Sequence, residues 1–231
     1  MPTGSVLGAL QGLGIYHKSD RETERKCLSF ILLIRAGFFI GASVTDIQSA
    51  CHAFNNLLHF EYEICLAKKK TLVKIHLHFQ KKDFHHLAGL HYLKDRPELR
   101  SDREKLFDKI LADDDFSTRI QKSDNYPKIK DRVFYLAKLE EFLDSDETVF
   151  KYNQNEAIFS RINADFLLKN ANFERTVFIF IKLEDNGKYV CNSFFPESDY
   201  DYSKNQISWK VLSKKKIDLL SGEEILLQQK D

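Results

Sequence analysis

Residues Lys81 to Pro97 have the sequence KKDFHHLAGLHYLKDRP, in which three histidines and one glycine lie in a short, otherwise apolar segment. We predict a helix from about Asp83, whose side chain caps its amino end, to Leu93. The imidazole group titrates near neutral pH and is the commonest proton-transfer group in enzymes. The first candidates for a functional site are therefore His85, His86 and His91.

The spacing of these histidines is unlike that of a zinc site. A helical metal pair needs histidines at i and i+4 together with a third ligand, whereas His85 and His86 are adjacent and His91 follows five residues later. The acidic run from Asp113 to Asp115 indicates a solvated surface and not a dispersed set of Mg²⁺ ligands. The sequence also contains no Walker loop, dinucleotide fingerprint, nucleophile elbow or kinase motif. We therefore expect no metal and no cofactor.

The residues before this segment predict a helix followed by a hairpin. Thr45 is the expected cap of an amphipathic helix of about 13 residues, because apolar side chains recur at helical spacing from Ile47 to Leu58. The runs Glu61 to Ala67 and Leu72 to Phe79 each alternate apolar with polar residues. This alternation predicts two antiparallel strands.

The residues after the segment predict more helices and then strands. Residues 98–144 show helical periodicity, most clearly from Asp102 to Leu111 and from Lys128 to Leu143. A last apolar element is expected from Trp209 to Leu212. Four strands are expected between the helices and this element, and they begin near Thr148, Asn163, Thr176 and Lys188. A DNG turn joins the last two of these strands. This order indicates an α+β fold, with helices packed on a small antiparallel sheet, and a single domain over residues 45–231.

Residues 1–44 are expected to form an appendage to this domain. Their apolar segment, residues 27–44, has about 18 residues, the lower limit for crossing a bilayer. Arg35 lies at its centre, and an arginine there costs about 2.5 kcal/mol or more on insertion scales. A membrane helix, a secretory signal, a core helix and a reading frame extended upstream of the true start are the alternatives. We expect no stable membrane association, with a tether through residues 27–44 as the minor alternative.

Charge and cysteine content narrow the functional classes. The chain has 35 basic and 34 acidic residues and a net charge of +1, so any site for a polyanion must be a local patch. The four cysteines, Cys27, Cys51, Cys65 and Cys191, show neither CxxC nor zinc spacing. This pattern favours reduced thiols in a cytoplasmic protein.

The remaining polar residue types suit one kind of chemistry. Metal-free cleavage of RNA needs a base for the 2′-hydroxyl proton, an acid for the leaving 5′-oxygen, and cations or hydroxyl donors to stabilise the phosphorane. A chain rich in His, Arg, Lys, Ser and Tyr, without a carboxylate cluster suited to Mg²⁺, contains these groups. RNA is accordingly a candidate substrate.

Several blocks of the sequence resemble one nuclease family. They are DFHHLAGLHYLKDRP, the KIKDR of Lys128 to Arg132, the NADFLL of Asn163 to Leu168 and the NSFFPES of Asn192 to Ser198. In this order, from near Thr45 to about Leu212, they are similar to the phage-associated Barnase, EndoU, colicin and RelE-like nuclease domains of the fourth group. The resemblance implies a metal-independent ribonuclease-type toxin or phage effector, built from amino-terminal helices and a small antiparallel sheet.

The resemblance also implies roles for individual residues. His86 occupies the histidine of the HL-x-GL block and is expected to act as general base or acid, with His85 in a supporting, substrate-binding position. Arg132 is expected to clamp the phosphate, because its planar guanidinium can hold two oxygens, and Lys130 is the secondary cation. Alternatively, His86 is a core histidine bonded to a backbone carbonyl and Arg132 pairs with a helix carboxylate.

Two hydroxyl groups complete the expected site, and the sequence leaves two possible functions. Ser193 and Tyr202 are the hydroxyl candidates, and Tyr202 is also placed to stack on a base; the alternative for both is a structural role. The first function is a ribonuclease that cleaves RNA by 2′-hydroxyl attack, with an immunity or antitoxin protein as a further partner. The second is a non-catalytic module that binds nucleic acid or protein on a degenerate nuclease fold.

Overall fold

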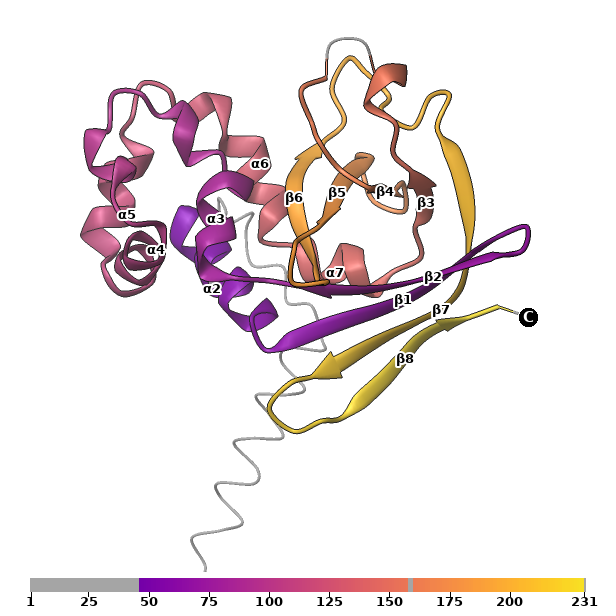
Figure 1. Cartoon of the computed structure of the whole chain (residues 1–231). Helices are drawn as coiled ribbons and strands as arrows, with labels where there is room; N and C mark the ends of the chain where they lie inside the picture. Colours follow the sequence, from indigo (N-terminus) through magenta and orange to yellow (C-terminus); the bar gives the residue numbers. More distant parts are fainter. Residues whose placement is uncertain (1–45, 158–159, 231) are drawn as a thin grey trace, which may run out of the picture. The chain divides into compact units, whose positions relative to one another are not determined.

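The structure, a computed structural model, describes residues 46–157 and 160–230 (Figure 1). These residues belong to one compact unit, Val44–Asp231. The appendage expected at residues 1–44, with its apolar segment at 27–44, lies outside the described residues. In the described ranges, no helix combines the length and the apolar character that crossing a bilayer requires.

Helices precede most of the strands along the chain, as the sequence predicts. The helices are α2 (Ile47–Leu57), α3 (Lys81–Leu87), α4 (Arg103–Ala112), α5 (Asp114–Gln121), α6 (Lys130–Leu136) and α7 (Leu139–Asp144), with short 3₁₀ turns between several of them. The strands are β1 (Phe60–Lys68), β2 (Thr71–His78), β3 (Thr148–Lys151), β4 (Phe166–Asn170), β5 (Val177–Leu183), β6 (Tyr189–Pro196), β7 (Ile207–Asp218) and β8 (Glu224–Gln229).

The strands close into a barrel, so the expected small antiparallel sheet covered by helices is wrong. The strand order is β1-β2-β6-β5-β4-β3-β7-β8, and β1 also pairs with β7, which closes the first seven strands into a ring among the described residues. The pairing of β2 with β6 is parallel, over Leu77↔Tyr189 and His78↔Val190, and the other pairings are antiparallel. The fold is therefore a mixed, closed barrel with helices beside β6 (Figure 1).

Ring closure depends on β7, which is longer than the expected element from Trp209 to Leu212. Its start, Ile207–Trp209, pairs with β3, and residues from Lys210 to Asp218 pair with β1. Two of its inward positions, Lys214 and Lys216, are lysines that are 0% and 5% exposed. The sequence around them, SKKKID, lacks the apolar alternation that identifies a half-buried strand. This part of the closing strand therefore cannot be predicted from periodicity.

Two predicted elements are confirmed, and one is shorter than expected. Helix α2 buries the predicted apolar stripe. Its cap is Asp46 and not the expected Thr45, and the Asp46 side chain accepts from the Ser49 amide (2.6 Å). Strands β1 and β2 form the predicted antiparallel hairpin. The helix expected from Asp83 to Leu93 instead runs from Lys81 to Leu87. Its N-cap is Gln80 and not Asp83, whose carboxylate accepts from the Gln80 amide at 2.9 Å. The helix ends early because Gly89 has a left-handed backbone with φ of 77°.

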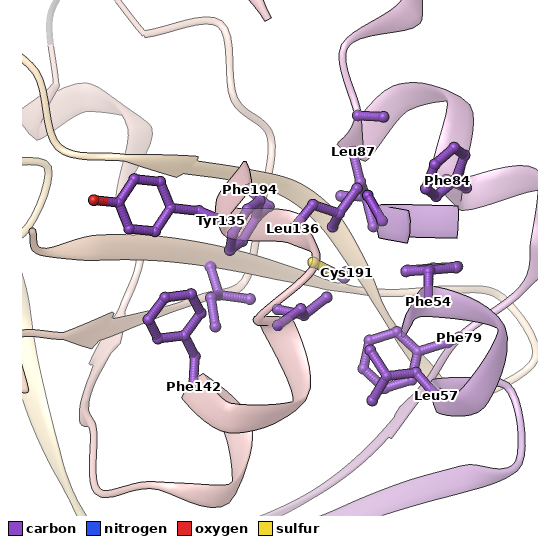
Figure 2. Close-up of a cluster of buried hydrophobic side chains, with 14 of the residues drawn as sticks. Phe54, Leu57, Phe79, Phe84, Leu87, Tyr135, Leu136, Phe142, Cys191 and Phe194 are labelled. Atoms are coloured by element: carbon purple, nitrogen blue, oxygen red, sulfur yellow. The ribbon is translucent and has the colours of Figure 1, made fainter. Parts of the chain in front are cut away.

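An aromatic core joins the helices to the barrel (Figure 2). Phe54 of α2 packs against Phe84 of α3 with ring centroids 5.6 Å apart, and Phe84 packs against Phe107 of α4 at 5.3 Å. On the barrel side, Cys191 and Phe194 of β6 belong to the same buried cluster. Burial of this apolar surface, at about 25 cal/mol per Å², fixes α3 and α6 against β6.

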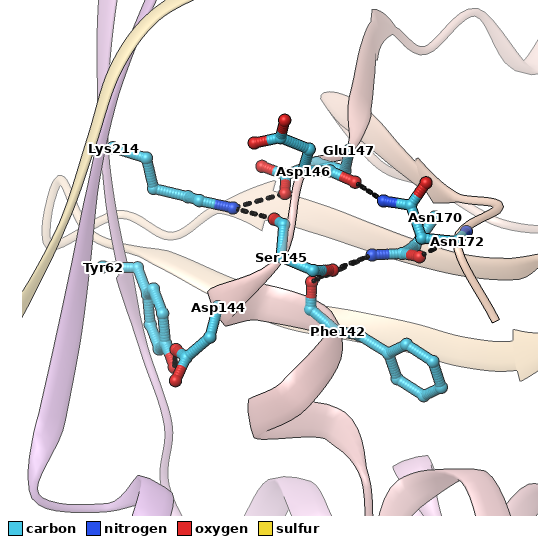
Figure 3. Close-up of polar contacts among 9 residues, drawn as sticks. All are labelled: Tyr62, Phe142, Asp144, Ser145, Asp146, Glu147, Asn170, Asn172 and Lys214. Atoms are coloured by element: carbon cyan, nitrogen blue, oxygen red, sulfur yellow. Dashed lines mark hydrogen bonds and ion pairs between the residues drawn. The ribbon is translucent and has the colours of Figure 1, made fainter. Parts of the chain in front are cut away.

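The buried lysines of β7 are held by residues of α7 and of the segment that follows it, and Figure 3 shows the contacts of Lys214. The Lys214 ammonium donates to the Ser145 carbonyl oxygen and to the Glu147 carboxylate. Lys216 donates to Glu140 (2.6 Å) and Asp144 (2.9 Å). These ion pairs replace the hydrophobic contacts that inward-facing strand residues usually make.

We expect Lys214→Met to lower the free energy of unfolding by about 3–5 kcal/mol, because it leaves the buried Glu147 carboxylate without its cation. The free energy is measured by equilibrium urea unfolding, and adding Glu147→Leu to the same chain should recover part of the loss. Lys215→Met is the matched control, since Lys215 is the adjacent residue and its pair with Glu224 is exposed. Equal losses for Lys214→Met and Lys215→Met would contradict the expectation.

Candidate active site

A cleft of about 780 Å³ lies where the helices meet β5, β6 and the loop after β6. Its walls come from segments that are far apart in the sequence: His86 and Tyr92, residues 128–132, residues 160–163, and the strand residues Asn192 and Ser193. The aromatic core beneath α3, α6 and β6 holds these segments together. The cleft is therefore built on fixed elements more than on loops.

The cleft is strongly basic although the whole chain is close to neutral. Of the residues that the structure describes, one carboxylate, that of Asp131, lines the cleft, and it is paired with Arg175 at 2.8 Å. The cations among its described lining residues are five, namely Lys128, Arg132, Arg161, Arg175 and Lys182. In a chain of net charge +1, this local concentration of cations makes the cleft electrostatically complementary to a polyanion.

Four of the six residues expected at the site line this cleft, and two do not. His86, Arg132, Ser193 and Tyr202 all contribute to its walls. The ring of His85 turns away, and its Nε2 donates to the Leu99 carbonyl oxygen at 3.1 Å. Lys130 is exposed at the start of α6 and does not line the cleft.

His86 faces the cleft with a neutral ring. Its imidazole stacks on that of His91, with centroids 4.8 Å apart and planes 10° from parallel, and His91 in turn contacts the Tyr92 ring at 4.1 Å. Partial burial, and then the charges of Arg132 and Arg103, lower the pKa of His86. Burial and the neighbouring His86 lower the pKa of His91 to about 4. At neutral pH His86 is therefore in the form that accepts a proton.

Arg132 presents an unpaired charge to the cleft. Its guanidinium lies between two aromatic rings, 5.6 Å from the Tyr92 centroid and 5.5 Å from that of Phe195. No carboxylate among the described residues forms an ion pair with it. Burial lowers the pKa of Arg132, but a guanidinium remains charged at all physiological pH values. The two rings and a hydrogen bond to the Tyr92 side chain fix its orientation, and its other N–H groups remain available for a ligand.

Gly89 is the residue that makes room for this arrangement. Its φ of +77° is unfavourable for any residue with a side chain, and a Cβ there would lie 3.0 Å from Ile129 Cγ2 and 3.2 Å from Arg132 Cδ. The Tyr92 ring would be 3.3 Å away. The glycine of the HL-x-GL block thus permits close contact between the His86 segment and Arg132.

The two predicted hydroxyl groups lie on the strand side of the cleft. Ser193, on β6, is 7% exposed, and its hydroxyl has no hydrogen-bond partner among the described residues. The Tyr202 ring packs edge-on against Phe180 and Phe195, with centroids 5.5 and 5.2 Å away. Burial raises the pKa of Tyr202, so its phenol is protonated at neutral pH and can donate a hydrogen bond to a ligand.

A β-bulge in β6 brings a further residue into the cleft. Phe180 pairs with Ser193 and Ile181 with Cys191, which leaves Asn192 as the extra residue between them. Two consecutive side chains, Asn192 and Ser193, therefore both line the cleft, whereas regular alternation would point one of them away. The Asn192 amide donates to the Asn163 carbonyl oxygen at 2.8 Å.

Sequence reasoning also missed most of the cations that line the cleft. Arg161, Arg175 and Lys182 lie in three separate segments, each without a motif. Lys128 belongs to the KIKDR block, whose basic face is most simply interpreted as solvated surface. Only the barrel topology places these side chains around one cleft.

An alanine in the left-handed conformation costs about 1–2 kcal/mol from backbone strain alone. Gly89→Ala should lower the free energy of unfolding by more than this, because the added methyl group also displaces Ile129 and Arg132. Gly187→Ala is the matched control. Gly187 has nearly the same φ, +81°, but no atom lies within 4 Å of an added Cβ. Thermal unfolding of the two variants separates crowding from backbone strain, and equal losses would contradict the proposed contact.

Comparison with known proteins identifies a family but no individual relative. No curated protein and no solved structure shows a significant match to the chain. A family model does match over residues 46–231, under the description phage-Barnase-EndoU-ColicinE5/D-RelE like nuclease4. The match extends past the predicted limit near Leu212 and includes the second half of β7 and all of β8. The match covers well over half of the chain and confirms the predicted family: the chain belongs to the fourth group of phage-Barnase-EndoU-ColicinE5/D-RelE like nucleases.

Proposed function

We propose that the cleft cleaves RNA without a metal ion, by attack of the 2′-hydroxyl on the adjacent phosphate. Membership of a nuclease family supports the general class. The observation that carries the proposal is that a neutral histidine, His86, and an unpaired guanidinium, Arg132, line the same basic cleft. A proton acceptor and a phosphate clamp are the two groups that this reaction needs most.

In the proposed reaction, His86 accepts the proton of the 2′-hydroxyl as its oxygen forms a bond to phosphorus. Arg132 holds two non-bridging oxygens and stabilises the negative charge that grows on the phosphorane. The bond to the 5′-oxygen then breaks, and the protonated phenol of Tyr202 supplies the proton to the leaving oxygen. The products are a 2′,3′-cyclic phosphate and a free 5′-hydroxyl, so no water is consumed in this step.

The other residues of the cleft have binding roles in this proposal. Arg175 and Lys182 contact the flanking phosphates, and Asp131 orients Arg175 through their 2.8 Å ion pair. Ser193 and Asn192 supply neutral donors beside the reacting phosphate. His85 and Lys130, which the structure places outside the cleft, are left without a direct role.

The wider role follows the family resemblance and belongs to the same proposal. We propose a toxin or phage effector that acts on RNA in the cytoplasm, with an immunity or antitoxin protein as its protein partner. The described cysteines, Cys51, Cys65 and Cys191, are all free thiols, which supports a reducing compartment. The alternative function, a binding module without catalysis, relies on the same basic cleft but assigns no proton transfer to His86.

RNA incubated with the protein in EDTA should yield fragments with 2′,3′-cyclic phosphate ends, and His86→Ala should reduce the rate about 10²–10⁴-fold. Gel electrophoresis and mass spectrometry of the ends are the measurements. His76→Ala is the control, because His76 pairs with Glu61 outside the cleft and its loss should leave the rate unchanged. A folded protein that binds RNA and leaves a broad substrate panel intact would favour the binding module.

The dependence of kcat/KM on pH should identify His86 as the base. The rate should rise with pH as His86 loses its proton, and because its pKa is lowered, the midpoint should fall below the ordinary value of 6.5. This rising limb should be absent from the residual activity of His86→Ala. If the rate instead declines as pH rises through this range, His86 acts as the acid.

A further inference from the structure

A second, smaller cavity lies behind the histidines of the cleft. It measures about 150 Å³ and is formed by α3, the turn Leu90–Tyr92 and the turn Pro97–Arg100. Three buried leucines form part of its wall, and no carboxylate lines it among the described residues. Its polar lining consists of nitrogen-bearing side chains only, those of His85, His91, Lys94, Arg96 and Arg100.

Two of these side chains carry buried nitrogen atoms without a partner. His91 Nδ1 and Arg96 Nε have no hydrogen bond among the described residues. Asp95 Oδ2 is 3.7 Å from Arg96 Nε, which is too long for a hydrogen bond, and the Asp95 carboxylate already accepts from Ser123 (2.7 Å) and Asn125 (2.8 Å). Buried polar groups are nearly always satisfied, so unpaired nitrogens beside a cavity indicate a ligand.

The size and chemistry of the cavity define that ligand. The volume is below the about 300 Å³ at which pockets for drug-sized molecules begin, so a nucleoside does not fit. Guanidinium and ammonium groups without a carboxylate favour an anion, and the fork of an arginine suits the oxygens of a phosphate. A single tetrahedral phosphate group meets both conditions.

The cavity and the cleft share one wall. His86 lines the cleft and His91 lines the cavity, and their stacked rings are 4.8 Å apart. A phosphate in the cavity would therefore lie one pair of rings away from the phosphate held by Arg132. Two sources can supply it, namely the next backbone phosphate of a bound RNA or a free inorganic phosphate.

We infer that this cavity is a phosphate-binding subsite, in which His91, Arg96 and Arg100 donate hydrogen bonds to one phosphate group. Its use by an RNA backbone rests on the proposed function, whereas binding of inorganic phosphate does not. His91 is a positioning residue here, because it contacts the bound phosphate on one side and the His86 ring on the other.

The pKa of the His91 imidazole reports on this subsite directly. Besides burial, the charges that lower it are His86, Arg132, His85 and Lys94. A phosphate bound beside His91 adds negative charge and an acceptor for Nδ1–H, so it favours the protonated ring. Occupancy should therefore raise the pKa of His91 from about 4.

The experiment follows the His91 ring by NMR while inorganic phosphate is added to the full-length protein. We expect the pKa of His91 to rise by at least one unit, and the apparent affinity for phosphate to weaken at least tenfold in Arg96→Gln with Arg100→Gln. The matched control is Arg175→Gln, which removes a cation from the cleft and should leave the His91 response intact. Circular dichroism establishes that each variant is folded.

A second arm uses a trinucleotide of 2′-deoxy residues, which is not cleaved. A His91 response to the trinucleotide that depends on Arg132 assigns the subsite to the RNA backbone, and a response to inorganic phosphate alone assigns it to the free anion. No response of His91 to either ligand, or an unchanged response in Arg96→Gln with Arg100→Gln, overturns the inference. If the protein cleaves RNA but the His91 ring responds to neither ligand, the subsite is rejected and the nuclease proposal is kept. If the His91 ring responds to phosphate but RNA is not cleaved, the nuclease proposal is rejected and the subsite is kept.

Discussion

The guanidinium of Arg132 between the rings of Tyr92 and Phe195 is the contact on which the site depends. It joins the segment after α3, the start of α6 and strand β6, which are far apart along the chain. The contact is possible because Gly89 has no side chain where a Cβ would meet Arg132. The same turn ends α3 and sends the chain back so that His91 stacks on His86.

The closed barrel gives this contact a rigid base. Strand β6 contributes Cys191 and Phe194 to the aromatic core and, through its bulge, directs Asn192 and Ser193 toward the cleft. Ring closure through β7 relies on buried lysines bonded to carboxylates, at the desolvation cost that such pairs carry. The helices, the core and the barrel thus act together to hold polar groups from several segments around one volume.

The sequence predicted the local elements and the residue types of the site well. Periodicity located α2 and the hairpin of β1 with β2, and the DNG turn located the hairpin of β5 with β6, where Gly187 has φ of +81°. The motif blocks contain His86, Arg132 and Ser193, and the tyrosine-rich loop after the last block contains Tyr202. The structure brings these four residues to one cleft. Such features depend on short-range patterns, which a single sequence records.

What the sequence could not predict depends on contacts between distant residues. The inward-facing lysines of β7 look like a solvated strand end, so neither the closing strand nor the barrel was expected. The bulge at Asn192 arises from a pairing register, and Arg161 and Arg175 reach the cleft only through the strand order. The single helix expected from Lys128 to Leu143 is two helices, α6 and α7, with a break at Ala137 and Lys138.

The central claim is that the cleft binds RNA with its scissile phosphate on Arg132 and its 2′ position at His86. The most direct measurement is a crystal structure with a dinucleotide that carries 2′-fluorine in place of the attacking hydroxyl. The claim predicts the phosphate in hydrogen-bond contact with the Arg132 guanidinium and the fluorine within about 3.2 Å of a His86 nitrogen. A dinucleotide bound elsewhere, or bound in the cleft with its 2′ position away from His86, would contradict it.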